Sequence, residues 1–476
     1  MSIYVWHDGR IELLPLVQRL NVQHGSSIEN LADVKVILRW CGDDKVLQSK
    51  KSMVLNHSSY TRGLLNESMI QSNLHLHAIS YMPPGRTANT SNTLLIKQHK
   101  PYYLIPVFLM EALTIYQQDK VESLSLKREY SHTHKLQEVL IEEKTGLHRR
   151  IERYAVRAVY AMGLDFACVY VQLLPSGKIV VTRIDIHPVQ NERIFDLYAQ
   201  AINNYGNKQI SEGLVRETVV FGMDPEFLLR NSQGKIVPAS KYLPAKGGVG
   251  YDSSTVLGRK HIHPLAELRP EPSEHVSALV NNLRRTMWTA ASQITDQSLQ
   301  WIAGGMPIQG LPLGGHLHIS GVTLNTRLIR ALDNYLALPL IMLEDTTTRE
   351  RRKKYGRLGD VRRPGHGGFE YRTLPSWIVS PSITKGVLAL VSLIVQHYEE
   401  LSDRPLDHSD ILIAYTEGNK YVLEPIVMQL WQQVETTSGY QTHRMYLEPL
   451  KIWIMEHRNW DEQHDFRMVW RIPPFN

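Results

Sequence analysis

Apolar residues recur at helical spacing in several stretches of the chain, and this periodicity predicts amphipathic helices. One such helix is expected over residues 148–162 and another over 274–291. Further helices are expected over 325–345 and 382–402, and the segment 404–476 is expected to be mostly helical with a tryptophan-rich end.

Shorter apolar runs that are bounded by turn residues predict strands. Residues 34–40 form one such run before a Cys-Gly-Asp-Asp turn, so we expect an α/β or α+β arrangement at the start of the chain. The runs 166–174 and 178–186 flank a Pro-Ser-Gly turn and predict a hairpin. Two later runs, 218–229 and 263–270, carry acidic residues among the apolar ones.

The chain of 476 residues is long enough to form more than one hydrophobic core. A polar, turn-forming stretch at 203–213 is the best linker candidate. It divides the chain into an N-terminal domain over 1–210 and a C-terminal domain over 215–476, with a helical tail from about residue 404. Polar residues from 74 to 100 predict an exposed loop.

Composition and charge are those of a soluble globular protein. Hydrophobic residues make up 43% and charged residues 21%, and because the sequence has no run of about twenty apolar residues, we expect neither export nor a membrane span. Cys41 and Cys168 are the only cysteines, so a disulfide framework and a thiolate zinc site are excluded and a cytoplasmic location is expected. The net charge of +6 and the pI near 9.0 favour anionic partners.

Acidic residues recur on the predicted strands of the C-terminal half. Asp224 and Glu226 stand two positions apart around a proline, so both are expected on one face of a strand at an edge or a bulge. Glu267 and Glu370 each precede an arginine by two positions on later strands. Buried carboxylates at this density need a cation. The alternatives are a surface Asp-Pro turn and an exposed, salt-bridged strand.

A histidine strand and an arginine-rich stretch complete this set. His316 and His318 share one face of a strand that follows two glycines, a pair that by itself is more often a polar strand face than a metal site. Three arginines of the stretch 349–374 are candidates for anion binding: Arg357, Arg362 and Arg372. Oxygen ligands with few nitrogens indicate Mg²⁺ or Mn²⁺, and guanidinium groups beside them indicate phosphate. Together these residues predict nucleotide chemistry, and phosphoryl transfer above all.

The order of these motifs resembles the carboxylate–amine ligases called amidoligases, within the glutamine synthetase and glutamate–cysteine ligase superfamily. The resemblance covers about 215–400 and rests on acid-x-acid at 224–226, a later strand glutamate, Gly-x-His-x-His at 314–318, two arginines five apart, and Glu-x-Arg before a proline at 370–375. The first acid is an aspartate, and the interval from Arg362 to Glu370 is shorter than in glutamine synthetase. These departures leave the acid and amine substrates undefined.

The resemblance implies an α+β fold with a glutamine-synthetase-like domain on a curved antiparallel sheet flanked by helices. It implies an ATP-dependent ligase that joins a small-molecule or peptide carboxylate to an amine through an acyl phosphate, with ATP and Mg²⁺ or Mn²⁺ as cofactors. The implied metal ligands are Asp224, Glu226, Glu267, His316 and Glu370. The implied nucleotide-binding residues are His316, His318, Arg357 and Arg362, and the implied catalytic residues are Arg357, Arg362 and Arg372.

Residues 163–188 resemble the closing segment of an ATP-grasp domain, in which two strands present acids and an asparagine to magnesium. Here Tyr170 and Arg183 stand where that family has acids, and Asp185 replaces the asparagine. No convincing glycine-rich phosphate loop with its lysine precedes them. The resemblance implies a degenerate, non-catalytic ATP-grasp-like α/β domain, and an unrelated hairpin packed on a helix is the alternative.

Three other functions stay open from the sequence. The basic run 349–354 could contact nucleic acid, although it lacks interleaved aromatic residues for stacking and is simpler to interpret as the solvated end of a helix. A guanidino-group kinase uses a related fold with ATP and magnesium, and an inactive scaffold would keep the fold without the reaction. The sequence does not indicate an oligomeric state.

Overall fold

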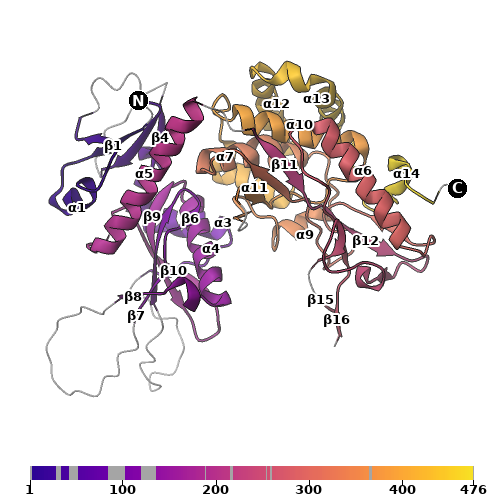
Figure 1. Ribbon diagram of the computed structural model, residues 1–476, viewed down its shortest axis with the longest axis horizontal. Helices are drawn as coiled ribbons and strands as arrows, with labels where there is room; N and C mark the ends of the chain where they lie inside the picture. Colours follow the sequence, from indigo (N-terminus) through magenta and orange to yellow (C-terminus); the bar gives the residue numbers. More distant parts are fainter. Residues whose placement is uncertain are drawn as a thin grey trace. The chain divides into compact units, whose positions relative to one another are not determined.

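The computed structural model describes residues 3–27, 34–41, 52–83, 102–118, 136–187, 189–214, 218–252, 255–257, 260–363 and 367–474. The chain forms two compact units, Met1–Arg216 and Glu217–Asn476 (Figure 1). In the described ranges, no helix is both long enough and apolar enough to cross a membrane.

The N-terminal unit contains one parallel and one antiparallel sheet (Figure 1). The parallel sheet has the order β2-β1-β3-β4, with β1 at Ile3–His7, β2 at Gln23–Gly25, β3 at Val36–Trp40 and β4 at Met53–Leu55. The antiparallel sheet has the order β10-β9-β5-β7-β8, with β5 at Tyr102–Phe108, β7 at Tyr116–Gln118, β8 at Leu136–Glu138, β9 at Phe166–Leu173 and β10 at Ile179–Asp185. A short β6, Glu111–Ala112, pairs with β5. The helices are α1 Leu14–Val17, α2 Ser58–Thr61, α3 Glu67–Leu76, α4 Gly146–Ala161 and α5 Glu192–Leu214.

The predicted helix and hairpin of this unit are confirmed. Helix α4 covers the predicted stretch and begins at Thr145, whose hydroxyl accepts a hydrogen bond from His148 N. Strands β9 and β10 pair antiparallel, as the Pro-Ser-Gly turn requires. Ile151, Ala155 and Ala158 of α4 are fully buried in a core that they share with β5 and β9.

The linker predicted at 203–213 is wrong, because these residues continue helix α5. Ile202 and Tyr205 extend the buried stripe of this helix. The polar Asn203 binds the segment that follows α1. Its side chain accepts from Asn21 N at 2.8 Å and donates to Arg19 O at 3.0 Å. Asn203 therefore serves packing within the unit rather than a free connection.

The loop predicted over 74–100 is wrong at its start, because helix α3 continues to Leu76. The side chain of Asn66 caps that helix by accepting from Ser68 N at 2.9 Å. Residues 84–100 of the predicted loop lie outside the described residues.

The C-terminal unit contains two main sheets, both antiparallel. The first has the order β11-β19-β21-β20, with β11 at Val220–Met223, β19 at Leu317–Ser320, β20 at Val361–Arg362 and β21 at Phe369–Tyr371. The second has the order β13-β12-β17-β14, with β12 at Glu226–Arg230, β13 at Ile236–Val237, β14 at Val249–Tyr251 and β17 at Leu265–Leu268; β18, Gln300–Ile302, also pairs with β12. A separate hairpin joins β15, Thr255–Leu257, to β16, Lys260–Ile262.

Helices flank these sheets (Figure 1). They are α6 Val276–Gln293, α7 Thr326–Leu332, a π-helical turn Asp333–Ala337, α8 Leu338–Leu340, α9 Thr348–Arg352, α10 Pro381–His397, α11 Ser409–Glu417, α12 Lys420–Thr436, α13 Tyr440–Met455 and α14 Arg467–Trp470. Mixed α/β structure with antiparallel sheets is confirmed, and the strands of the C-terminal unit divide into two main antiparallel sheets.

Helix α10 is the central helix of this unit. The side chain of Ser380 caps it by accepting from Ile383 N at 3.2 Å, and Pro381 occupies its first turn. The helix is apolar and buried for most of its length, and it packs against α6, α7 and α13. At Gly386 a methyl group would lie 2.6 Å from Leu450 Cβ, so glycine permits the close approach of α13.

Candidate active site

The two sheets of the C-terminal unit adjoin at Asp224 and Pro225. Strand β11 ends just before Asp224, and strand β12 begins at Glu226. The two acids therefore lie at the ends of different strands, whereas the sequence had predicted them on one face of the same strand. Proline has no N–H to continue either ladder, which explains the break. The segment just before β19 runs alongside this break and binds both sides of it: Asp224 N donates to His316 O at 3.3 Å, and Glu226 N donates to Gly314 O at 2.9 Å.

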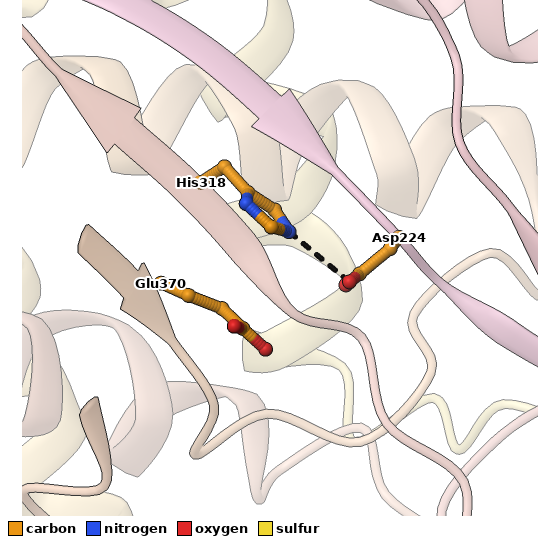
Figure 2. A group of neighbouring side chains, drawn as sticks. All are labelled: Asp224, His318 and Glu370. Atoms are coloured by element: carbon orange, nitrogen blue, oxygen red, sulfur yellow. Dashed lines mark ion pairs between the residues drawn. The ribbon is translucent and has the colours of Figure 1, made fainter. Parts of the chain in front are cut away.

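Asp224, His318 and Glu370 form a compact group of possible metal ligands. Each offers one ligand atom, and these atoms all lie within 4.8 Å of one another. His318 and Glu370 are paired residues of β19 and β21, and His318 Nε2 lies 3.1 Å from Asp224 Oδ2. Figure 2 shows the three side chains meeting from neighbouring strands. The structure therefore places His318, predicted as a nucleotide contact, with two predicted metal ligands.

His316 lies between the same two acids. Its Nδ1 atom is 3.1 Å from Asp224 Oδ1 and 3.4 Å from Glu370 Oε1. Burial opposes a charge on this ring, but Asp224 and Glu226 outweigh burial and raise the pKa of His316. Burial also opposes a charge on Asp224, yet the two histidines hold the pKa of Asp224 well below its ordinary value. In this geometry His316 is a cationic partner of the acids, and its role as a metal ligand stays a prediction.

Glu226 and Glu267 face each other across strands β12 and β17. Burial is the main cause that raises the pKa of Glu226 to about 7. Burial, followed by the charge of Asp224, raises the pKa of Glu267 to about 9, although Arg269 forms an ion pair with this carboxylate. Glu226 Oε2 also accepts from Gly314 N at 2.6 Å. The second pair of predicted acids is therefore buried next to Asp224.

Two of the three predicted arginines reach the acids. Arg362 pairs with Glu370 across β20 and β21 and forms an ion pair of 2.5 Å with it. Arg372 Nε lies 3.5 Å from Glu370 Oε1. The side chains of Arg362 and Arg372 are 52% and 33% exposed, so both guanidinium groups can also meet a ligand from solvent. Arg357 donates to Lys353 O at 2.8 Å, and its role at the site stays a prediction.

The donor set fits a divalent cation. Asp224 Oδ1 and Glu370 Oε1 are buried, and within the described part of the chain neither accepts a well-directed hydrogen bond, although His316 Nδ1 lies 3.1 Å and 3.4 Å from them. Buried carboxylate oxygens are normally satisfied, so these two atoms mark a place for a positive ligand. Four carboxylates with one or two imidazoles are a ligand set for Mg²⁺ or Mn²⁺ rather than for zinc or copper.

The basic run that precedes the site has partners of its own. Arg351 is buried and donates to Leu313 O at 2.7 Å, Thr373 O at 2.9 Å and Leu374 O at 2.6 Å. The other ion pairs of the run are Arg349 with Glu417, Arg352 with Glu344, and Lys353 with Glu350. Internal contacts explain this density of positive charge without nucleic acid.

In the N-terminal unit, the charged side chains of the predicted ATP-grasp-like hairpin bind one another. Arg183 lies opposite Tyr170 in the β9–β10 ladder, forms an ion pair with Asp185, and places its guanidinium carbon 5.3 Å from the centre of the Tyr170 ring. These contacts occupy the side chains at the positions where the predicted ATP-grasp resemblance would place metal ligands. The degenerate ATP-grasp assignment itself stays a prediction.

Sequence patterns missed three further residues near the site. Asp252 directly follows β14, the strand that pairs with the strand of Glu267, and its charge adds to burial in raising the pKa of Glu226. Asp333 and Arg351 are buried and bind the segments that carry the arginines and β21. A buried acid in an apolar helix is the only signal that could have indicated Asp333.

The sequence profile of the family described as phage phiEco32-like COOH.NH2 ligase-type 2 matches residues 221–472. A search of curated proteins found no match. Three solved structures are similar in part: the ATP-grasp ligase PsnB complexed with minimal precursor (8% identity, 44% of this chain and 99% of that chain covered, TM-score 0.30), glutamate–cysteine ligase from Francisella tularensis in complex with AMP (10%, 51% and 82%, 0.34), and Plasmodium falciparum glutamine synthetase (9%, 68% and 77%, 0.27). These TM-scores are below 0.5, so the match to the sequence profile alone shows the family of this chain.

Proposed function

Because the chain belongs to the phage phiEco32-like COOH.NH2 ligase-type 2 family, we propose that its C-terminal unit is an ATP-dependent ligase that joins a carboxylate to an amine. The observation that carries the proposal is the group Asp224, His318 and Glu370 with Arg362 and Arg372 beside it. A cation site next to exposed guanidinium groups is what the phosphates of a nucleotide require.

The proposed residue roles follow from these contacts. Asp224, His318 and Glu370 hold Mg²⁺ or Mn²⁺, with Glu226 and Glu267 as further oxygen ligands nearby. When bound, the cation supplies positive charge to the phosphate oxygens and orients them. Arg362 and Arg372 donate to the phosphoryl oxygens, and these hydrogen bonds strengthen as negative charge develops during transfer.

The proposed reaction has two steps. A substrate carboxylate oxygen attacks the γ-phosphorus of ATP, so that a new O–P bond forms, the bond to the β-phosphate oxygen breaks, and ADP leaves. An amine then attacks the acyl carbon of this acyl phosphate, a C–N bond forms, the C–O bond to phosphate breaks, and the amine proton passes to solvent or a base. The products are an amide, ADP and phosphate.

Release of ADP and phosphate tests this proposal. The purified protein is incubated with ATP, Mg²⁺ and pooled amino acids or short peptides, and the assay is repeated with Glu226→Gln and Glu370→Gln. Removal of a group that stabilises developing charge typically costs about 10²- to 10³-fold in rate, so both variants are expected to lose at least about a hundredfold. Glu435→Gln, which changes a carboxylate paired with Lys451 on helix α12, is the control and is expected to match the wild type.

Two results would count against the proposal. Equal turnover in the wild type, Glu226→Gln and Glu370→Gln would show that these carboxylates do not form the active site. A phosphorylated guanidino product without amide formation would identify a guanidino-group kinase instead.

A further inference from the structure

Asp333 is a buried carboxylate that binds the segments carrying the site residues without belonging to the candidate metal ligands. It opens the π-helical turn Asp333–Ala337 between helices α7 and α8, and it is 1% exposed. π-helical turns interrupt the regular hydrogen-bond pattern of a helix and are frequent at functional sites.

The carboxylate of Asp333 joins two segments that carry proposed active-site residues. Its Oδ1 atom accepts from Tyr371 Oη at 2.6 Å and lies 3.4 Å from Thr373 Oγ1. Its Oδ2 atom accepts from Gly359 N at 2.7 Å. Tyr371 belongs to β21, and Gly359 belongs to the turn before β20.

The bond to Tyr371 orients the opposite face of β21. Successive side chains of a strand point to opposite faces, so Tyr371 points toward Asp333 while Glu370 and Arg372 point toward the candidate metal site. Burial, and then the charge of Asp333, hold the pKa of Tyr371 well above its ordinary value, so this hydroxyl stays a donor. Tyr371 is fully buried, which leaves the strand little freedom to rotate.

The bond to Gly359 orients the arginine turn. Gly359 has a φ of +72°, in the left-handed region that favours glycine, and its N–H points at the Asp333 carboxylate. The same turn is held to β21 by Arg372 N, which donates to Asp360 O at 3.0 Å, and by Thr373 Oγ1, which donates to Arg357 O at 3.0 Å. The Asp333 carboxylate thus binds both the turn that leads to Arg362 and the strand that carries Glu370, the two residues that form the ion pair.

We propose that Asp333 is a positioning residue, which sets the placement of Arg362 against Glu370 and thereby the affinity of the site for a Mg²⁺-bound nucleoside triphosphate. This inference rests on the proposed function. Asp333 does not touch the nucleotide itself, and it acts through the turn at Gly359 and through β21.

Calorimetric titration of the full-length protein with Mg²⁺ and AMPPNP, a non-hydrolysable ATP analogue, tests the inference. In Asp333→Asn only one of the two side-chain positions can still accept, so either Gly359 N or Tyr371 Oη loses its acceptor, whereas Tyr371→Phe removes only one donor. Groups that orient ligand-binding residues typically change affinity by about 10- to 100-fold, so Asp333→Asn is expected to weaken binding by about that factor and Tyr371→Phe by less. If Asp333→Asn fails to fold, Tyr371→Phe decides the question.

Glu462→Gln is the matched control. Glu462 is also a buried carboxylate of this unit, and it accepts from Gly305 N at 2.6 Å, Met306 N at 3.1 Å and Thr347 Oγ1 at 2.9 Å, away from the bonds that hold β21. Its replacement is expected to lower the melting temperature without changing the affinity for Mg²⁺-AMPPNP. Equal weakening by Glu462→Gln and Asp333→Asn would show a general effect of stability and overturn the inference.

A double-mutant cycle with Arg362→Gln distinguishes positioning from general disturbance. If Asp333 acts through Arg362, its replacement adds little once Arg362 is gone; independent effects would multiply within about twofold and would overturn the inference. Wild-type affinity in both Asp333→Asn and Tyr371→Phe would also overturn it. A wild-type protein that does not bind Mg²⁺-AMPPNP would instead refute the proposed function, and the inference with it.

Discussion

Glu226 and Glu267 give the site a dependence on pH. Their pKa values of about 7 and about 9 lie above the ordinary 4.5, so the folded protein holds protons that the unfolded chain has already released. The folded state therefore binds more protons, and without a divalent cation its stability is expected to fall as pH rises from about 4.5 to about 9. A cation that binds the ionised carboxylates reverses this loss.

Thermal unfolding with EDTA and with Mg²⁺ tests this dependence. We expect Mg²⁺ to raise the melting temperature more at pH 9 than at pH 6, because protons compete with the metal at the lower pH. Glu267→Gln is expected to flatten the pH dependence seen with EDTA between pH 7 and 9. A Mg²⁺ effect that is largest at pH 6 would contradict the prediction.

At the scale of residues, spacing predicted which side chains lie together better than it predicted their individual contacts. Asp224 and Glu370 come together because motifs on neighbouring strands bring them there. Alternation also placed His316 and His318 on one face, but it could not show which ring contacts which carboxylate oxygen. Asp333 escaped prediction because its partners, Gly359 and Tyr371, lie 26 and 38 residues away in sequence.

Arg351 joins the elements around the site at the next scale. Its guanidinium group donates to backbone carbonyls before β19 and after β21, so it ties helix α9 to both. Removing it takes the donor from Leu313 O and Thr373 O, whereas Leu374 O keeps the hydrogen bond from Gly315 N. Each such loss typically costs about 1–3 kcal/mol, so Arg351→Met is expected to lower the free energy of unfolding by about 2 kcal/mol or more.

Urea unfolding followed by tryptophan fluorescence measures this effect, with Trp377 as a buried reporter in the same unit. Arg351→Lys is expected to recover only part of the loss, because an ammonium group cannot match the fork of three donors. Arg349→Met removes an exposed pair with Glu417 and is expected to change stability by less than about 1 kcal/mol. Equal losses in the Arg351 and Arg349 variants would contradict this account.

Periodicity predicted whole elements well and their connections poorly. Helices α4, α6 and α10 follow from apolar stripes, because a stripe reports the buried face directly. The failed linker at 203–213 shows the limit, since polar residues on the outer face of a helix resemble those of a loop. The break at Pro225 was visible, but only the register of partner strands shows that it separates two sheets.

The division into two units governs the molecule as a whole. The motifs along the chain place all proposed catalytic groups after residue 217, and the structure keeps Asp224, His318 and Glu370 within the second unit. In the first unit, Arg183 and Asp185 neutralise each other. The sequence placed these side chains in one half of the chain, but it could not show what the other half contributes.

Separate expression of the units tests this division. A fragment of residues 217–476 is expected to fold and to bind Mg²⁺-AMPPNP within about twofold of the full chain, because the proposed ligands and their supports lie inside it. Glu370→Gln in the fragment is expected to abolish that binding, and a fragment of residues 1–216 is expected to bind no Mg²⁺-nucleotide. Loss of affinity in a folded 217–476 fragment would show that the first unit completes the site. If binding survives but turnover with peptides falls, the first unit acts on the substrate rather than on the nucleotide.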